Sequence, residues 1–168
     1  MQRFPMSLDT GRRVLLAVIL GALVIACVGI AAQGGVLPSS GLLAVLAVTV
    51  AGTWASAPTA LAIDAGTLRV ERHVGTALTV PLTTISDVEM VGRLGLAFLL
   101  GRRDLFGEHT PGWSRAFGWI RVYRTRNDGG VLVRRRGAWP LYLTPDDPER
   151  FVAALRSVCA PFGMLAPR

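Results

Sequence analysis

Residues 14–32 read VLLAVILGALVIACVGIAA, and this stretch decides the first half of the architecture. All 19 residues are apolar or small, and Arg12 and Arg13 stand directly before them. A helix rises about 1.5 Å per residue, so a segment of this length matches the ~30 Å hydrocarbon core of a bilayer. The stretch predicts a membrane-spanning helix over residues 14–32.

The uncharged character extends well beyond this segment. No Asp, Glu, Lys, Arg or His occurs from residue 14 to residue 63, a run of 50 residues. Residues 33–41 contain QGG and PSSG, which predict a polar, turn-rich break. A second apolar stretch follows from residue 42, with Pro58 near its end. We expect two transmembrane helices, at about 14–32 and 42–60, that form a hairpin.

The charged residues bear on topology. The chain of 168 residues has 18 arginines, no lysine and 11 acidic residues, for a net charge of +7 and a mean hydropathy of +0.46. Both the basic tail, residues 1–13, and the part after residue 63 carry an excess of arginine. Because Arg-rich loops stay in the cytoplasm, we predict a multi-pass protein of the cell (inner or plasma) membrane with both termini cytoplasmic.

One alternative for the first apolar segment stays open. Residues 24–27, VIAC, are similar to a bacterial lipobox, in which Cys27 would become the lipidated first residue of the mature protein. The apolar run continues for five residues beyond Cys27. That continuation favours a retained span over a cleaved signal.

After residue 63 the pattern changes to short strands. Residues 67–72 alternate strictly, residues 76–82 and 85–90 continue an apolar series, and NDGG at 127–130 is a strong hairpin signal. Further strands are expected at 118–126, 131–133 and 138–143, which together predict an antiparallel sheet or small barrel. We expect its interior to hold Leu68, Val70, Leu78, Val80, Ile120, Val122, Val131, Val133 and Leu141.

The C-terminal part is predicted to be helical. Asp147 suits the N-cap position, Pro148 the first helical position, and Glu149 the positive end of the helix dipole. Phe151 and Leu155 then fall on one face, which we expect to cover one end of the barrel.

Residues 92–117 fit neither the strand nor the helix pattern. They combine Leu105, Phe106 and Trp113 with arginines such as Arg102 and Arg103. The segment is too long for a plain loop in a compact domain. Apolar side chains beside arginines are typical of interfacial elements, so the segment is either a membrane-contacting excursion or part of the barrel core or a lid.

The second half resembles a bacterial pleckstrin-homology (PH)-like domain. The resemblance rests on FGWIRVY at residues 117–123 and on WPLYLTPDDPERFV at residues 139–152, in which a strand leads through Leu-Thr-Pro-Asp-Asp-Pro into a helix. It covers roughly residues 61–160 and leaves residues 161–168 as a tail. It implies a seven-stranded, bent antiparallel barrel closed by the C-terminal helix, within an α+β, mainly β chain. It implies no catalytic motif.

The arginines are the strongest candidates for functional residues, since the sequence contains no catalytic, cofactor-binding or metal-binding motif. The candidate contacts to anionic lipid are Arg102, Arg103, Arg134, Arg135 and Arg136. Each basic residue near such a surface contributes ~1 kcal/mol, although basic cytoplasmic turns are expected beside any membrane. We therefore predict a membrane protein whose cytoplasmic PH-like module serves protein interaction or scaffolding, without catalysis, cofactor or nucleic acid. The alternative is a membrane-tethered sensor of anionic lipid or a small ligand.

Overall fold

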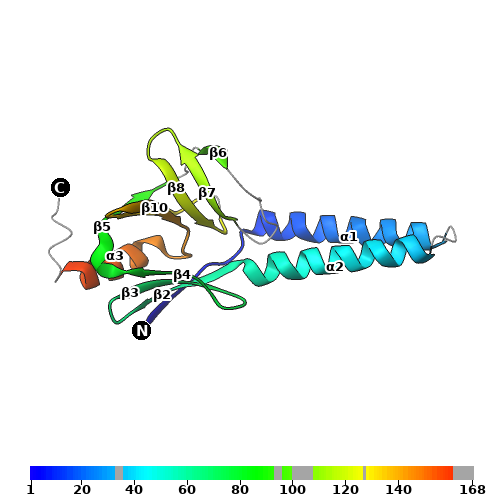
Figure 1. Cartoon of the computed structure of the whole chain (residues 1–168), viewed down its shortest axis with the longest axis horizontal. Coiled ribbons are helices and arrows are strands. Elements are labelled where there is room, and N and C mark those ends of the chain that lie inside the picture. Colours follow the sequence, from blue (N-terminus) through cyan, green and yellow to red (C-terminus); the bar gives the residue numbers. More distant parts are fainter. Residues whose placement is uncertain (33–35, 93–95, 100–107, 127, 161–168) are drawn as a thin grey trace.

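A long helical hairpin projects from a domain built of two sheets (Figure 1). The computed structural model describes residues 1–32, 36–92, 96–99, 108–126 and 128–160, and the rest of the chain lies outside it. The hairpin consists of α1 (Thr10–Ala32) and α2 (Val36–Ser56). Both apolar segments are thus helical, as predicted.

The limits of the two helices differ from those expected. α1 begins at Thr10 rather than Val14, and α2 includes Pro38, which the sequence placed in a turn. Proline is tolerated in a first helical turn because the N–H groups there have no intrahelical partner. The predicted extension of the second helix to residue 60 is wrong, since a strand begins at Pro58. By length and hydropathy, no helix among the described residues qualifies as a membrane span, so the two predicted spans are not confirmed.

Sheet A is antiparallel, with the strand order β1-β2-β3-β4. Its strands are β1 (Gln2–Pro5), β2 (Pro58–Asp64), β3 (Thr67–Arg72) and β4 (Thr76–Pro81). β3 coincides with the predicted strand because its alternation is a local signal. The sequence does not predict β1, which pairs with β2 across the whole hairpin and sets Phe4 opposite Leu61.

Sheet B has six strands in the order β5-β9-β10-β8-β7-β6. The strands are β5 (Ile85–Val91), β6 (Leu96–Leu99), β7 (Glu108–Ser114), β8 (Gly118–Arg124), β9 (Gly130–Arg135) and β10 (Ala138–Leu143). A short 3-10 turn, η1 (Leu82–Thr84), connects the two sheets. β6 and β7 fall within residues 92–117, so part of that segment belongs to sheet B. Leu105 and Phe106 lie outside the described residues.

The predicted hairpin at residues 127–130 is wrong. β8 and β9 flank this turn, but β10 lies between them, parallel to β8 and antiparallel to β9. Leu141, Tyr142 and Leu143 of β10 are all fully buried. A strand buried on both faces belongs in the middle of a sheet. β10 therefore forms the hydrogen bonds with β8 and β9 that these two strands would have formed with each other in a hairpin. The described part of the domain is therefore not a seven-stranded antiparallel barrel: the strands are more numerous and sheet B is mixed.

The main core lies between the sheets and α3 (Pro148–Cys159). Most residues expected inside are fully or almost fully buried there, and Leu78 is partly buried against them. Phe151 and Leu155 join the same core from α3, as predicted. Asp147 is the N-cap, since its Oδ1 accepts a hydrogen bond from the Arg150 N–H at 2.9 Å.

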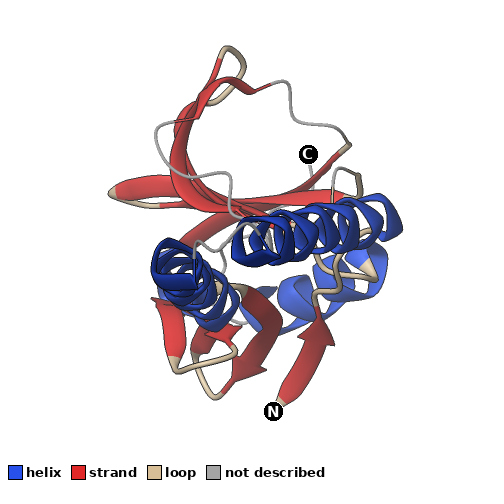
Figure 2. Ribbon diagram, turned by 90° about the vertical axis from the view of Figure 1, so that its right-hand side faces the viewer, coloured by secondary structure: helices blue, strands red, loops and turns tan. Residues whose placement is uncertain are grey.

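Ile120 and Val122 depart from the predicted interior. They pack with Leu132 and Tyr142 in a second apolar cluster. Successive strand residues point to opposite faces of a sheet, so this cluster lies on the other face of sheet B from the main core. Figure 2 shows how strongly the sheet curves on this side. Sheet B is consequently buried on both faces near its centre.

Candidate interaction surface

The five arginines that the sequence singles out fall into two groups. Arg102 and Arg103 lie outside the described residues. Arg134 and Arg135 end β9, and Arg136 begins the turn to β10. The structure therefore gathers Arg134, Arg135 and Arg136 at one end of sheet B.

The neighbouring arginines Arg134 and Arg135 differ in their surroundings. Arg134 Nη2 lies 3.4 Å from Glu89 Oε2, and Arg134 Nε lies 3.7 Å from Asp87 Oδ2, with both acids on β5. Arg135, the next residue along the strand, points to the opposite face. There its Nε and Nη2 both donate to the carbonyl oxygen of Trp139. Arg134 is thus balanced by two carboxylates, whereas Arg135 is held by a neutral backbone group.

Three exposed tryptophans lie in a row beside Arg135. Trp119 on β8 stacks on Trp139 of β10, with ring centroids 5.7 Å apart and planes at 20°. Trp113 on β7 is directly opposite Trp119 in the ladder, so both point to the same face. The exposed fractions are 38% for Trp113, 40% for Trp119 and 46% for Trp139. These three residues, together with Arg121 and Arg135, are called the Trp–Arg surface below.

Arg121 and Arg135 give the Trp–Arg surface its charge. Burial lowers the pKa of Arg135, and the positive charge of Arg121 lowers it further. Neither arginine forms an ion pair with an acidic residue in the described part of the chain. Two guanidinium groups that repel one another favour the binding of an anion between them.

The Trp–Arg surface lies at the end of sheet B away from the hairpin. β8 runs toward α1, because the Thr125 carbonyl just after it accepts a hydrogen bond from Asp9 N, just before α1, at 3.5 Å. β10 is parallel to β8, and β7 and β9 run the other way. Trp119 and Trp139 therefore lie near the distal starts of their strands, and Trp113 and Arg135 near the distal ends of theirs. Figure 1 shows the turn between β7 and β8 far from the helices.

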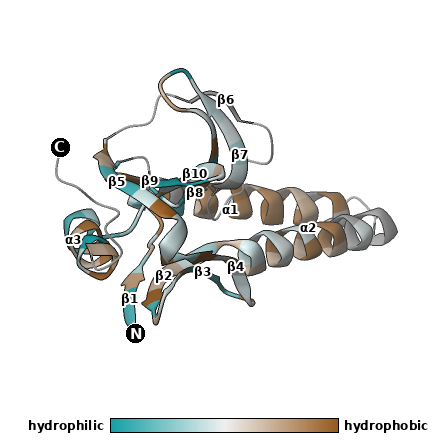
Figure 3. Cartoon of the chain, turned by 60° about the vertical axis from the view of Figure 1, so that its left-hand side comes forward, coloured by the Kyte–Doolittle hydropathy of each residue, from teal (hydrophilic) through white to brown (hydrophobic). Residues whose placement is uncertain are grey.

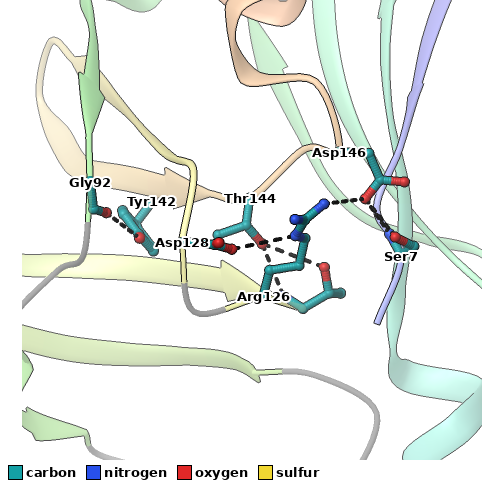
Figure 4. Close-up of polar contacts among 8 residues, drawn as sticks. Ser7, Gly92, Arg126, Asp128, Tyr142, Thr144 and Asp146 are labelled. Carbon is teal, nitrogen blue, oxygen red and sulfur yellow. Dashed lines mark hydrogen bonds and ion pairs between the residues drawn. The ribbon is translucent and has the colours of Figure 1, made fainter. Parts of the chain in front are cut away.

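A polar junction ties the segment before α1 to the domain (Figure 4). The Ser7 N–H and Oγ each donate to Asp146 Oδ1 at 2.8 Å, and the Asp146 N–H donates to the Pro5 carbonyl at 3.0 Å. Arg126 Nη1 lies 3.8 Å from the same carboxylate oxygen, and Arg126 Nε lies 3.5 Å from Asp128. Asp146 therefore links the N-terminal segment, the end of β8 and the approach to α3.

A second junction lies at the same base of the hairpin, where the turn between β3 and β4 meets the end of α2. Val74 N donates to the Ala55 carbonyl at 3.2 Å, and His73 N donates to the Ala57 carbonyl at 3.4 Å. These bonds satisfy carbonyls that the end of a helix leaves without intrahelical partners. Trp54 stacks on His73 with ring centroids 4.2 Å apart. Trp54 and Val74 remain exposed beside the base of the hairpin.

No protein-family model, curated protein or solved structure matches this chain significantly. Within the described residues, no group of three or more His, Cys, Asp or Glu side chains is placed to hold a metal ion. The sequence does not reveal the Trp–Arg surface, because the surface depends on the register of β7, β8, β9 and β10 and on the position of β10 between β8 and β9. Its signal in the sequence is limited to single tryptophans near strand ends.

Proposed function

We propose that this chain is an integral protein of the cell membrane, anchored by the α1–α2 hairpin with both termini cytoplasmic, and that its domain is a non-catalytic module for protein interaction. The observation that carries the proposal is the outer surface of the hairpin, where large apolar side chains are exposed along both helices. They are Val14, Val18, Val24, Ile25, Val28 and Ile30 on α1, and Leu43, Val45, Val48 and Trp54 on α2.

Such a surface is unfavourable in water. A monomeric soluble protein rarely exposes a contiguous apolar patch larger than a few hundred Å². A helix on the surface of a soluble domain has one polar face, whereas α1 is hydrophobic all round from Val14 onward (Figure 3). Leu15 and Ala31, whose side chains lie outside the described part of the chain, complete its 19-residue apolar run. Contact with lipid removes the cost of about 25 cal/mol for each Å² of apolar surface in water.

The polar side chains of α2 suit the same environment. The hydroxyls of Thr49, Thr53 and Ser56 each donate to the carbonyl four residues earlier, at 2.8, 2.9 and 2.9 Å. In lipid every polar group needs a partner within the protein. These hydroxyls therefore add little to the cost of inserting α2.

The base of the hairpin has the features of a membrane–water boundary. Trp54 and Val74 are exposed there, and the exposed Arg13 lies near the start of α1. Tryptophan favours the interfacial region, and arginine on this flank favours a cytoplasmic location. Both junctions with the two-sheet domain lie on this side of the hairpin, which supports a cytoplasmic domain close to the membrane.

We also propose that the domain is a variant of the PH-like fold. Its support is the C-terminal helix, capped by Asp147 and packed by Phe151 against a core shared by two sheets. The parallel pairing of β8 and β10 is a departure from the expected antiparallel barrel.

The position of the Trp–Arg surface favours a protein partner over the alternative of an anionic-lipid sensor. β8 rises about 3.3 Å per residue, so Trp119 lies ~20 Å from Thr125 beside α1. Attraction between charges is largely screened beyond the Debye length of ~8 Å at physiological ionic strength. Tryptophan and arginine are also the residues most enriched among the energetic centres of protein interfaces.

Cysteine labelling tests the anchoring and topology in cells. In a Cys27→Ala/Cys159→Ala background, Ser39→Cys near the hairpin tip should react with an impermeant maleimide in intact cells. Ser157→Cys on α3 should react only after the cells are opened. Recovery of the protein in the supernatant after alkaline carbonate extraction, or the reverse labelling pattern, would contradict the proposal.

A further inference from the structure

We propose that the Trp–Arg surface binds a short acidic segment of a protein partner, with carboxylates on the two guanidinium groups and an apolar side chain against the tryptophan stack. The inference names the class of partner for the interaction module, and so rests on the proposed function. It is carried by the charge, the shape and the position of this surface.

The positive charge of the surface is complementary to carboxylates. Arg135 uses one N–H at Nε and one at Nη2 for the Trp139 carbonyl, which leaves three of the five guanidinium donors for a ligand. Leu141 of β10 pairs with both Arg121 and Val133, and Val133 lies two residues before Arg135, so the two arginines point to the same face of sheet B. Arg121 forms no ion pair within the described residues. Arg136 adds a further exposed positive charge at the same end of the sheet. Guanidinium groups bind carboxylates through paired, charge-assisted hydrogen bonds.

The area of the surface fits a short segment rather than a whole globular protein. A tryptophan side chain offers up to ~250 Å², so three that are about 40% exposed present roughly 300 Å² in all. A standard interface between globular proteins needs about 800 Å² on each partner. The stacked rings of Trp119 and Trp139 form a flat platform, which suits a proline or leucine side chain lying between acidic residues.

Among the residues that the structure describes, nearby acidic groups do not already fill the site. Asp87 and Glu89 are engaged by Arg134, whose side chain points to the opposite face of sheet B. The membrane that holds the hairpin lies at the other end of the sheet, beyond the range of screened attraction.

Binding can be measured on the full chain in nanodiscs of zwitterionic lipid. The probe is a fluorescein-labelled peptide in which Glu and Asp residues flank a Pro-Leu pair, and its control has Gln and Asn at those acidic positions. We expect anisotropy to report binding of the acidic peptide alone, with weaker binding at high salt. Trp119→Ala should also weaken it. Arg121→Gln/Arg135→Gln should weaken it about tenfold or more, as the loss of charge-assisted bonds predicts.

Two matched variants separate local charge from net charge and from fold. Arg69→Gln removes an exposed arginine from sheet A and should leave the affinity unchanged. Arg135→Lys keeps the charge but loses the planar fork, and should show an intermediate affinity. Each variant is compared by its circular-dichroism melting curve, and binding is scored on variants that melt as the parent does.

The inference is overturned if the acidic peptide binds no better than its amide control, or if Arg69→Gln weakens binding as much as the double variant does. It is also overturned if single-stranded RNA or vesicles of anionic lipid displace the labelled peptide at a lower concentration than the unlabelled acidic peptide does. Failure of the proposed anchoring gives a different result. In that case the acidic peptide still binds, but the protein leaves the membrane on carbonate extraction.

Discussion

Phe151→Ala tests how the C-terminal helix closes the core. Phe151 is fully buried and meets Phe4 of β1 edge to face, with ring centroids 5.2 Å apart and planes at 80°. The contact joins the last helix to a strand that precedes the hairpin, so it connects the two ends of the described chain. Its loss should loosen α3 and β1 together.

The expected cost follows from the buried ring. Truncation of a buried phenylalanine to alanine costs ~3–5 kcal/mol, from lost burial and the cavity left behind. The edge-to-face pairing with Phe4 accounts for about 0.5–1.5 kcal/mol of that sum. A double-mutant cycle with Phe4→Leu and Phe151→Leu isolates this part, since the two rings are in contact.

Urea unfolding of the full chain in mild detergent, followed by tryptophan fluorescence, measures these costs. Arg150→Ala is the control, because its exposed side chain should contribute no more than ~0.5 kcal/mol. A loss below ~1 kcal/mol for Phe151→Ala would refute the argument that α3 seals the core.

Three further predictions concern single positions. Gly130→Ala should destabilise the domain by ~1–3 kcal/mol or more, because the added Cβ would clash with the Tyr142 ring; the cost should shrink in a Tyr142→Leu background, and no change in urea midpoint would contradict the packing. Asp147→Ala should cost ~1 kcal/mol and Asp147→Ser clearly less, because serine also caps helices; equal losses in thermal unfolding would rule out capping. Burial raises the pKa of the Cys159 thiol, so its reaction with a maleimide should keep accelerating at pH values where an exposed thiol has levelled off; a rate that levels off together with that of Ser157→Cys would contradict this.

Elements with local signals were predictable from the sequence. β3, β10 and the cap of α3 follow from strict alternation, a short apolar run and the Asp-Pro-Glu order. β5 shows the limit of such patterns. Ile85 and Val88 are both buried although three residues apart, because a bulge between Ile85 and Asp87 shifts the register against β9.

Long-range pairing was not predictable in the same way. β1 has four residues and finds its partner only across the whole hairpin. The turn at residues 127–130 reverses the chain, but its residues carry no information on whether β10 enters between β8 and β9. The Trp–Arg surface depends on that same strand order, so the sequence identified Arg135 without its tryptophan neighbours.

The most direct test of the central claim is the reactivity of a cysteine at Val48 in the membrane. The side chain of Val48 is 73% exposed in the isolated chain, so only lipid or another protein shields it. In the Cys27→Ala/Cys159→Ala background, Val48→Cys and Ser157→Cys are treated with a water-soluble maleimide in open membranes and again in denaturant. We predict that Val48→Cys is unreactive until the membrane is dissolved and the protein is denatured. Ser157→Cys should react at once. Equal rates for the two cysteines in open membranes would contradict a hairpin embedded in lipid.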